Sequence, residues 1–327
     1  MATHQKIRIL ILGGTKFIGK NLIKKLSSKN FIVDIVSRKK IKDKNYNINI
    51  FYNIELKKIN EINYKIKYDY ILDFISKEEK KLKKIFEKIN FKKYIFISTS
   101  WLVKLNNKIR LNKKVDNYLI FKKNINKDTK KYLLNKYNLE KFIYEKSKVK
   151  KDKKFYILRL PIILGNEDNT DRLNFYFSRA KNLRRQILIK DKFFLNLLCV
   201  DDFCISLVKM LKKNLWPKNM FLEALNLNKI TYNEFLHAIN KKLNLKNIKL
   251  LSYNKSFLRK KFRFIFRYDP FINEVNLKLT KDNIFKITKH SPKKFDNFLK
   301  KIKVNKNTNK MFSLNKLKEI KFLNRYS

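Results

Sequence analysis

Glycine, proline and cysteine are all scarce in this chain. Its 327 residues include four glycines, four prolines and two cysteines. Cys199 and Cys204 are too few and too close in sequence for a disulfide framework or a zinc site, and their apolar neighbours predict buried free thiols. The three histidines, His4, His237 and His290, are dispersed, so no metal site is expected.

Long apolar runs are also missing. The first residues, MATHQKIR, lack the apolar segment of a signal peptide, and no run is long enough to cross a bilayer. We therefore expect a soluble cytoplasmic protein with no membrane partner. A hydrophobic content of 44% suffices for a full core. The length allows one α/β domain of ordinary size with a smaller companion.

Acidic residues are few. Asp and Glu number 27 against 80 Lys and Arg, which gives a formal net charge of +53. Such a charge, taken alone, suggests nucleic acid or an anionic membrane surface as a partner. Lys, Asn and Ile are elevated along the whole chain, however, whereas a binding site concentrates its cations on one face. We interpret the charge as a composition bias of surface positions and expect no specific nucleic-acid partner.

Three of the four glycines lie together near the start of the chain. The apolar run Ile7–Leu12 predicts a buried strand, and Gly13, Gly14 and Gly19 follow it. Apolar residues then recur at helical spacing, at Phe17, Ile18, Leu22, Ile23 and Leu26. A strand, a glycine turn and a helix present backbone N–H groups and a positive helix end to a pyrophosphate, although an ordinary tight turn is the alternative. The predicted cofactor-binding residues of this turn are Gly13, Gly14, Thr15, Lys16, Phe17, Ile18 and Gly19.

The end of the second predicted strand, Phe31–Ser37, bears on the choice of cofactor. Sites that prefer NAD place an acid there to hold the ribose hydroxyls. Here Ser37 and Arg38 occupy that place, and Asp34 lies too early, inside the strand. An absent carboxylate and a nearby guanidinium favour NADP(H) over NAD(H), with NAD(H) still possible. The alternative is that Arg38 is one more surface cation.

Further strands alternate with helices along the first half of the chain. The expected elements are a strand at Tyr70–Ile75, a helix at Ser76–Ile89, a strand at Tyr94–Ser98, a helix at Lys131–Lys146 and a strand at Phe155–Leu160. This alternation predicts an α/β fold with a Rossmann-type doubly wound parallel sheet. Residues 104–130 are polar and predict an irregular, exposed excursion.

The second half of the chain has a looser pattern. We expect a nucleotide-binding domain over residues 1–164 and a smaller α+β substrate-binding domain over 165–327, which ends in a basic tail. Residues 195–215 are expected to return to the first domain. Residues 221–243 predict a short strand and an amphipathic helix, and the tail from Asn305 shows only weak periodicity.

Tyr132 and Lys136 are the candidates for catalysis. They are four residues apart, and therefore on one face of the predicted helix. A phenol has a pKa of about 10, and a nearby ammonium lowers it, so that the pair can move a proton while a nicotinamide moves a hydride. Thr99 or Ser100, at the carboxyl end of the fourth strand, would hold the same substrate oxygen. Alone, this pattern also fits an exposed helix turn.

In this order the motifs resemble the extended short-chain dehydrogenase/reductase family, the NAD(P)-dependent epimerase/dehydratase group. The resemblance runs from Ile7 to about Leu243. The segments that carry it are GGTKFIG (13–19), FISTS (96–100), the set Tyr132, Lys136 and Glu140, LRLPIILG (158–165) and CVDDF (199–203). Five matches in the right order are specific for the fold and less so for the reaction.

The resemblance implies a role for each matching residue. Tyr132 is the implied acid/base, and Lys136 is implied to lower its pKa and to hold the nicotinamide ribose. Thr99 is implied to bind the reacting oxygen, with Ser100 as the second choice. The implied substrate is a nucleotide-activated sugar held between two domains, and a homodimer is possible.

Two departures from the family pattern affect this interpretation. Lys16 replaces the usual middle glycine, as in a branch that includes RNA-binding members. No carboxylate follows Thr99, because Ser100 and Trp101 stand there. This disfavours a 4,6-dehydratase and leaves a ketoreductase or an epimerase. The alternative function is an RNA-binding or cofactor-sensing protein on the same fold with little catalytic activity.

One later segment, RKKFRFIFRY at residues 259–268, interleaves cations with aromatic residues. It could stack on nucleic acid or lie at a membrane edge. We favour a third interpretation, an ordinary element of the substrate-binding domain whose cations extend into water.

Overall fold

The computed structural model describes residues 6–26, 30–39, 46, 48–55, 58, 61–62, 65–102, 127–183, 185–272, 282–305, 307 and 309–326. Most of the predicted excursion at 104–130 lies outside these residues. The chain divides into two compact units. Unit 1 contains Met1–Pro161, Val200–Leu225 and Leu279–His290, and unit 2 contains Ile162–Cys199, Asn226–Lys278 and Ser291–Ser327.

Unit 1 is built on a sheet of seven strands in the order β11-β6-β5-β4-β1-β2-β3. In chain order these are β1 (Ile7–Leu12), β2 (Phe31–Val36), β3 (Ile50–Tyr52), β4 (Lys67–Asp73), β5 (Asn90–Thr99), β6 (Lys154–Leu160) and β11 (Phe221–Glu223). Every neighbouring pair is parallel. The predicted doubly wound parallel sheet is therefore confirmed. The strand order reverses between β1 and β4, the place where such sheets bind ligands at the carboxyl ends of the strands.

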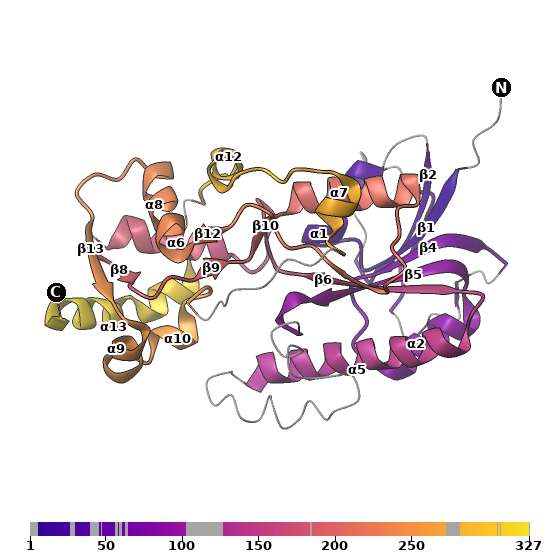
Figure 1. Ribbon diagram of the computed structural model, residues 1–327, viewed down its shortest axis with the longest axis horizontal. Helices are drawn as coiled ribbons and strands as arrows, with labels where there is room; N and C mark the ends of the chain where they lie inside the picture. The colour runs from indigo at the N-terminus through magenta and orange to yellow at the C-terminus, as the bar shows by residue number, and fades with distance from the viewer. Residues whose placement is uncertain are drawn as a thin grey trace. The chain divides into compact units, whose positions relative to one another are not determined.

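Helices cover both faces of this sheet. Those of unit 1 are α1 (Phe17–Leu26), α2 (Glu79–Lys88), the short 3-10 helix η2 (Ser100–Leu102), α5 (Lys127–Val149), α7 (Val200–Lys213) and α11 (Ile284–Thr288). Figure 1 shows α1 and α7 on one face and α2 and α5 on the other. The central strands β1, β2 and β6 are almost entirely buried, as are the carboxyl-terminal halves of β4 and β5, and these stretches are correspondingly rich in apolar residues.

Several predicted boundaries differ from the structure. Ser37 lies beyond the end of β2, and the predicted strand 70–75 runs from Lys67 to Asp73 instead. The predicted helix 76–89 begins only at Glu79. The helix predicted at 131–146 is longer, so that residues 127–130, predicted as irregular, form its first turn.

Unit 2 combines helices with three short strand pairs. Its helices are α6 (Arg172–Asn182), α8 (Tyr232–Lys242), α9 (Lys255–Lys261), α10 (Ile265–Tyr268), α12 (Phe295–Lys300) and α13 (Lys310–Tyr326). Its strands are β7 (Ile162–Leu164), β8 (Arg185–Ile189), β9 (Phe194–Leu195), β10 (Leu197–Cys199), β12 (Ile230–Thr231) and β13 (Lys249–Tyr253). Strands β7 and β10 pair in parallel, as do β8 and β13, and β9 pairs with β12 antiparallel. In the tail after Asn305, where the sequence shows only weak periodicity, Lys310–Tyr326 form the long helix α13.

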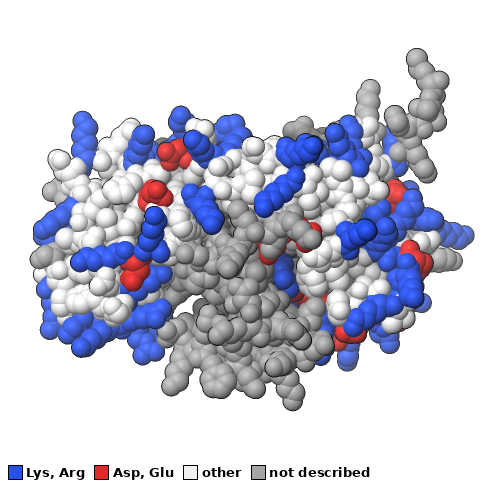
Figure 2. All heavy atoms as spheres, in the orientation of Figure 1, with Lys and Arg blue, Asp and Glu red and all other residues white. Residues whose placement is uncertain are grey.

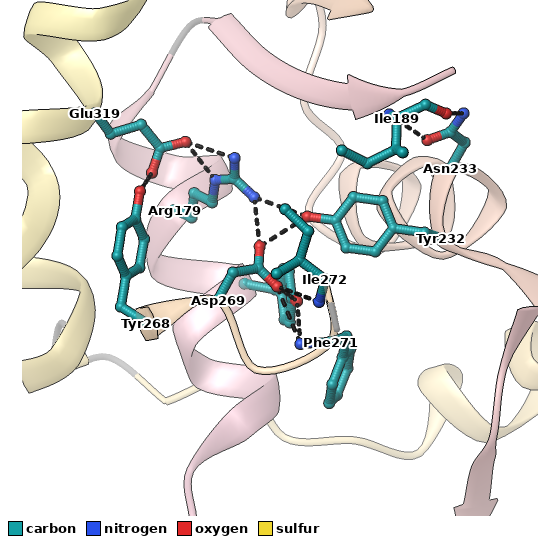
Figure 3. A network of polar contacts seen from close by, with 10 residues as sticks. Arg179, Ile189, Tyr232, Asn233, Tyr268, Asp269, Phe271, Ile272 and Glu319 are labelled. Carbon is teal, nitrogen blue, oxygen red and sulfur yellow. Dashed lines mark hydrogen bonds and ion pairs between the residues drawn. The ribbon is translucent and has the colours of Figure 1, made fainter. Parts of the chain in front are cut away.

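A buried polar network holds α13 in unit 2 (Figure 3). Arg179 of α6 donates to Glu319 of α13 over 2.7 Å and lies 3.2 Å from the carboxylate of Asp269. Tyr232 donates to Asp269 over 2.8 Å, and Tyr268 donates to Glu319 over 3.1 Å. Because the arginine and both acids are almost fully buried, the network ties α6, α8, α10 and α13 together in one arrangement.

No helix among the described residues combines the length and the apolar character that a membrane crossing requires.

Candidate functional site

The glycine turn after β1 leaves no room for side chains. Gly13 has a φ of +90°, and a Cβ there would lie 2.1 Å from a methyl carbon of Ile75. A Cβ on Gly19 would lie 2.6 Å from the Cα of Gly14. The first helical turn of α1 thus packs on the backbone of the loop itself. These contacts explain why a chain with so little glycine has three of its glycines here.

The amino end of α1 faces the same turn. The helix begins at Phe17, and Lys16 before it is exposed. The hydroxyl of Thr15 lies 2.7 Å from that of Ser37, which joins the glycine turn to the end of β2. The predicted cofactor-binding residues 13–19 and Ser37 are therefore brought together. Backbone N–H groups at a helix start are suited to a phosphate.

The carboxyl end of β2 carries no available acid. Asp34 is buried within the strand, where its carboxylate accepts hydrogen bonds from the side chains of Arg8 and Asn49 over 3.0 and 2.8 Å. Arg38, one residue after Ser37, is exposed. The carboxylate that would bind a ribose in an NAD site is therefore replaced by a serine with a cation beside it.

Three of the predicted catalytic residues, Thr99, Ser100 and Lys136, lie at or beside the end of β5. Thr99 is the last residue of the strand, and Ser100 begins η2, against which α5 packs. The Nζ of Lys136, on α5, donates to the carbonyl oxygen of Ile97 over 2.7 Å and lies 4.3 Å from the centre of the Phe96 ring. The ammonium group of Lys136 is thus held at Ile97, two residues before Thr99 on β5.

Tyr132 lies one helical turn before Lys136 on the same helix. Helix α5 leads into the parallel strand β6, so it runs against the strand direction and its first turns lie toward the carboxyl edge of the sheet. The Tyr132 side chain is 48% exposed, whereas Lys136 is 8% exposed. The pair therefore combines an anchored, buried ammonium with an accessible phenol.

The electrostatics of Lys136 are set by its burial. Burial lowers the pKa of Lys136 to about 8, while the negative charges of Asp73 and Glu140 oppose this change and the cation Lys77 adds to it. A buried ammonium loses its hydration, and nearby carboxylates replace part of that stabilisation. Lys136 is therefore close to the point of exchanging a proton near neutral pH.

Glu140, the last residue of the Tyr132–Lys136–Glu140 set, has a structural partner. Its carboxylate accepts two hydrogen bonds from Arg159 of β6, over 3.0 and 2.5 Å. Both side chains are buried. Two motifs of the sequence, on α5 and β6, therefore meet in one ion pair that fixes the helix to the sheet next to Lys136.

Asp73 is a neighbour of Lys136 that was not among the residues predicted from sequence. It is the last residue of β4, opposite Leu12 of β1 and Phe96 of β5. It therefore stands between the glycine turn and the ring on which Lys136 rests. Its carboxylate accepts hydrogen bonds from the backbone N–H groups of Ile75 and Ser76, over 2.9 Å each, and from the hydroxyl of Tyr94. The sequence contained a signal for Asp73, because an acid within an otherwise apolar strand is buried and needs a hydrogen-bond or charge partner.

Comparisons with known proteins identify the fold. No family model matches the chain, and no curated protein matches it. Solved structures do. A UDP-glucose 4-epimerase from Thermotoga maritima, with UDP-glucose, is 16% identical at a TM-score of 0.61, over 90% of this chain and 96% of the other. A UDP-N-acetylglucosamine 4-epimerase from Methanobrevibacter ruminantium, in complex with UDP-N-acetylmuramic acid, is 15% identical with a TM-score of 0.60, and the match covers 90% of this chain and 96% of the other. MoeE5, in complex with UDP-glucuronic acid and NAD, is 12% identical with a TM-score of 0.58, and the match covers 90% of this chain and 97% of the other.

The chain has the fold of NAD-dependent epimerase/dehydratase structures. The predicted resemblance is thereby confirmed at the level of the fold, across nine tenths of the chain. Within the epimerase fold, the seven-stranded sheet is followed by a smaller carboxyl-terminal region, as predicted. At such low identities the shared fold does not extend to the reaction, which has to be argued from the residues themselves.

Proposed function

We propose that this protein is an NAD(P)-dependent enzyme of the extended short-chain type that reduces or epimerises a carbon of a nucleotide sugar. One observation carries the proposal. Lys136 is buried and anchored on the carbonyl of Ile97, one helical turn from Tyr132, beside the strand that ends in Thr99. An exposed helix turn, the alternative explanation of this pattern, would not bury its lysine on the sheet.

The residues of the glycine turn suit a bound dinucleotide. Gly13 and Gly14 let the turn pack closely against Ile75 and Ile23, and the start of α1 would offer N–H groups to the pyrophosphate. When bound, the cofactor would supply and accept the hydride. In this proposal Lys136 also holds the nicotinamide ribose.

Tyr132 is proposed to move the proton. A neighbouring ammonium favours the ionised form of a phenol, so Tyr132 can take a proton from a carbinol oxygen or return it. Thr99 is proposed to donate a hydrogen bond to the same oxygen, with Ser100 as the second choice. Ser100 and Trp101 follow Thr99, so no carboxylate at this point can assist loss of water, and elimination is not proposed.

We further propose a preference for NADP(H), with NAD(H) as the alternative. It is supported only by Ser37 and Arg38 at the end of β2 and by the engagement of Asp34 with Arg8. The similar protein MoeE5 is described with NAD, so the comparisons give this preference no support. The cofactor preference is tested by measuring the dissociation constants for NADPH and NADH. Tighter binding of NADH would show that Arg38 does not bind a 2′-phosphate.

The test of the reaction is turnover of nucleotide sugars by wild type and by Tyr132→Phe. UDP-, GDP- and dTDP-sugars are incubated with either cofactor, and the products are separated by chromatography. We expect Tyr132→Phe to lose about 100- to 10,000-fold in turnover with unchanged cofactor affinity. Tyr144→Phe, on the same helix, is the control. A variant Tyr132→Phe that turns over normally excludes Tyr132 from the reaction.

Two outcomes would favour the alternative functions. Tight cofactor binding without turnover of any sugar favours a cofactor-sensing protein. Sequence-dependent RNA binding that persists near physiological salt favours an RNA-binding protein, because non-specific attraction to cations falls steeply as salt rises.

A further inference from the structure

Helix α13 has apolar side chains on its buried side and on its exposed side. The buried side contributes Phe312, Phe322 and Leu323 to the core of unit 2, and Asn315 and Glu319 are buried beside them. On the outer side Met311, Leu314 and Leu317 are 41%, 70% and 72% exposed. Their spacing of three residues places them in one row on successive turns. Large aliphatic side chains grouped in this way on a surface indicate a binding site.

Cations surround this row. Lys310, Lys318, Lys321 and Arg325 are exposed on the same helix. Lys318 also lies 3.7 Å from the centre of the Phe264 ring, which connects the helix to the neighbouring segment 259–267. That segment adds five exposed cations, Arg259, Lys260, Lys261, Arg263 and Arg267. We call the outer row of α13 together with these cations the α13 face.

The α13 face lacks negative charge of its own. Segments 255–268 and 310–326 contain a single acid, Glu319, which is buried against Arg179 (Figure 3). In Figure 2, Lys and Arg side chains gather at the lower left, in the part of unit 2 where Figure 1 has α9 and α13. A second copy of this chain would be repelled by the same charges, so the partner has to be anionic.

The chemistry of the face separates the possible anionic partners. Single-stranded nucleic acid needs aromatic side chains for stacking, but Phe262, Phe266 and Tyr268 of the basic segment are buried. The half-buried ring of Phe264 already has Lys318 and Arg267 within 3.7 and 6.0 Å of its centre. A stable protein interface buries about 800 Å² on each partner, far more than three side chains supply. A lipid surface requires no such area, because aliphatic side chains enter the acyl region while Lys and Arg remain at the phosphates.

We propose that the α13 face binds the surface of an anionic lipid bilayer, with Met311, Leu314 and Leu317 inserted and the surrounding cations at the phosphate groups. The expected absence of a membrane partner rested on the lack of a long apolar run. That lack concerns membrane-crossing segments, whereas this face needs only three side chains on a helix already held by unit 2. The inference is independent of the proposed reaction.

The test is co-sedimentation of the full chain with vesicles of phosphatidylcholine that contain phosphatidylserine. Wild type is expected to bind these vesicles and to stay in solution with phosphatidylcholine alone. The double variant Leu314→Ser and Leu317→Ser keeps every charge, and we expect its partition coefficient to fall at least about tenfold. Unchanged binding of this variant, or no binding by wild type, overturns the proposal.

A second pair of variants controls for the large net charge. Lys310→Ser with Lys321→Ser, and Lys84→Ser with Lys88→Ser on α2, remove the same charge from the face and from another exposed helix. Only the first pair should weaken binding, by about fivefold for each cation. Equal losses in both pairs show general attraction and contradict the proposal. Unaltered circular dichroism confirms folding, and RNA binding that depends on Leu314 and Leu317 would assign the face to another partner.

Discussion

Lys136 is an ammonium group placed where water has little access. Its charge is supported by the carbonyl of Ile97 and by the carboxylates of Asp73 and Glu140. The proposed reaction requires this charge next to Tyr132. Burial lowers the pKa of Lys136 and the two acids raise it, so the direction in which a single substitution changes this pKa can be predicted.

The stability of the protein should depend on pH through Lys136. Its pKa is about 8 in the folded protein and 10.5 for an ordinary lysine. Between these values the unfolded chain holds a proton that the folded protein has released, so stability rises with pH. Relative to Lys136→Met, wild type should gain up to about 3 kcal/mol from pH 7.5 to 10.5. Urea unfolding of both proteins at several pH values measures this, and a constant difference contradicts it.

Asp73→Asn should lower the pKa of Lys136 further. The substitution keeps the shape of the side chain but removes the charge that stabilises the ammonium. The pKa of Lys136 is measured from the pH dependence of its modification by a small reagent that reacts with neutral amines, followed by mass spectrometry. Tyr94→Phe is the control, since it removes the hydroxyl that donates to Asp73 and keeps the carboxylate. Equal midpoints in wild type and Asp73→Asn would show that Asp73 has no influence.

At the scale of elements, helix α5 is positioned by one buried ion pair. Glu140 and Arg159 join it to β6, on the same helix as Tyr132 and Lys136. Any displacement of α5 along the sheet would move the proposed catalytic residues away from Thr99.

Glu140→Gln should destabilise unit 1 by about 3 kcal/mol, because Arg159 would keep a buried charge without a counter-ion. Thermal and urea unfolding measure the loss. Glu145→Gln, which breaks an exposed pair with Lys148 on the same helix, should cost less than about 1 kcal/mol. Adding Arg159→Met to Glu140→Gln should restore part of the stability. If Glu140→Gln behaves like Glu145→Gln, the buried pair does not hold the helix.

At the scale of the whole molecule, the net charge of +53 opposes compactness. Like charges distributed over the surface repel one another, and salt screens them over about 10 Å at 0.1 M. Figure 2 shows Lys and Arg side chains scattered across the described surface in view, with fewer acids among them.

The melting temperature should therefore rise as sodium chloride is increased from about 0.02 to 0.3 M. The same experiment with choline chloride separates screening from specific ion binding, because both salts screen equally. A melting temperature that stays constant or falls would mean that local ion pairs outweigh the overall repulsion.

The features predicted correctly from sequence are those written in local patterns. The apolar runs and the alternation of strands and helices determine a parallel sheet, because each strand must be buried on both faces. The three glycines of the first turn determine its close packing, because no other residue fits there. The Tyr132–Lys136 spacing determines that both side chains lie on one side of a helix, and their catalytic role stays a prediction.

Only the tertiary structure decided the features that depend on distant residues. Asp73 belongs to the site because β4 lies between β1 and β5, which local sequence does not specify. Helix α13 was missed because Asn315 and Glu319 face inward while Leu314 and Leu317 face outward, which hides its periodicity. Glu319 can be buried because Arg179, 140 residues earlier in the chain, donates a hydrogen bond to it. A local pattern shows which residues can be buried. Burial of a charge is favourable only next to a suitable partner, and the tertiary structure determines which residue that partner is.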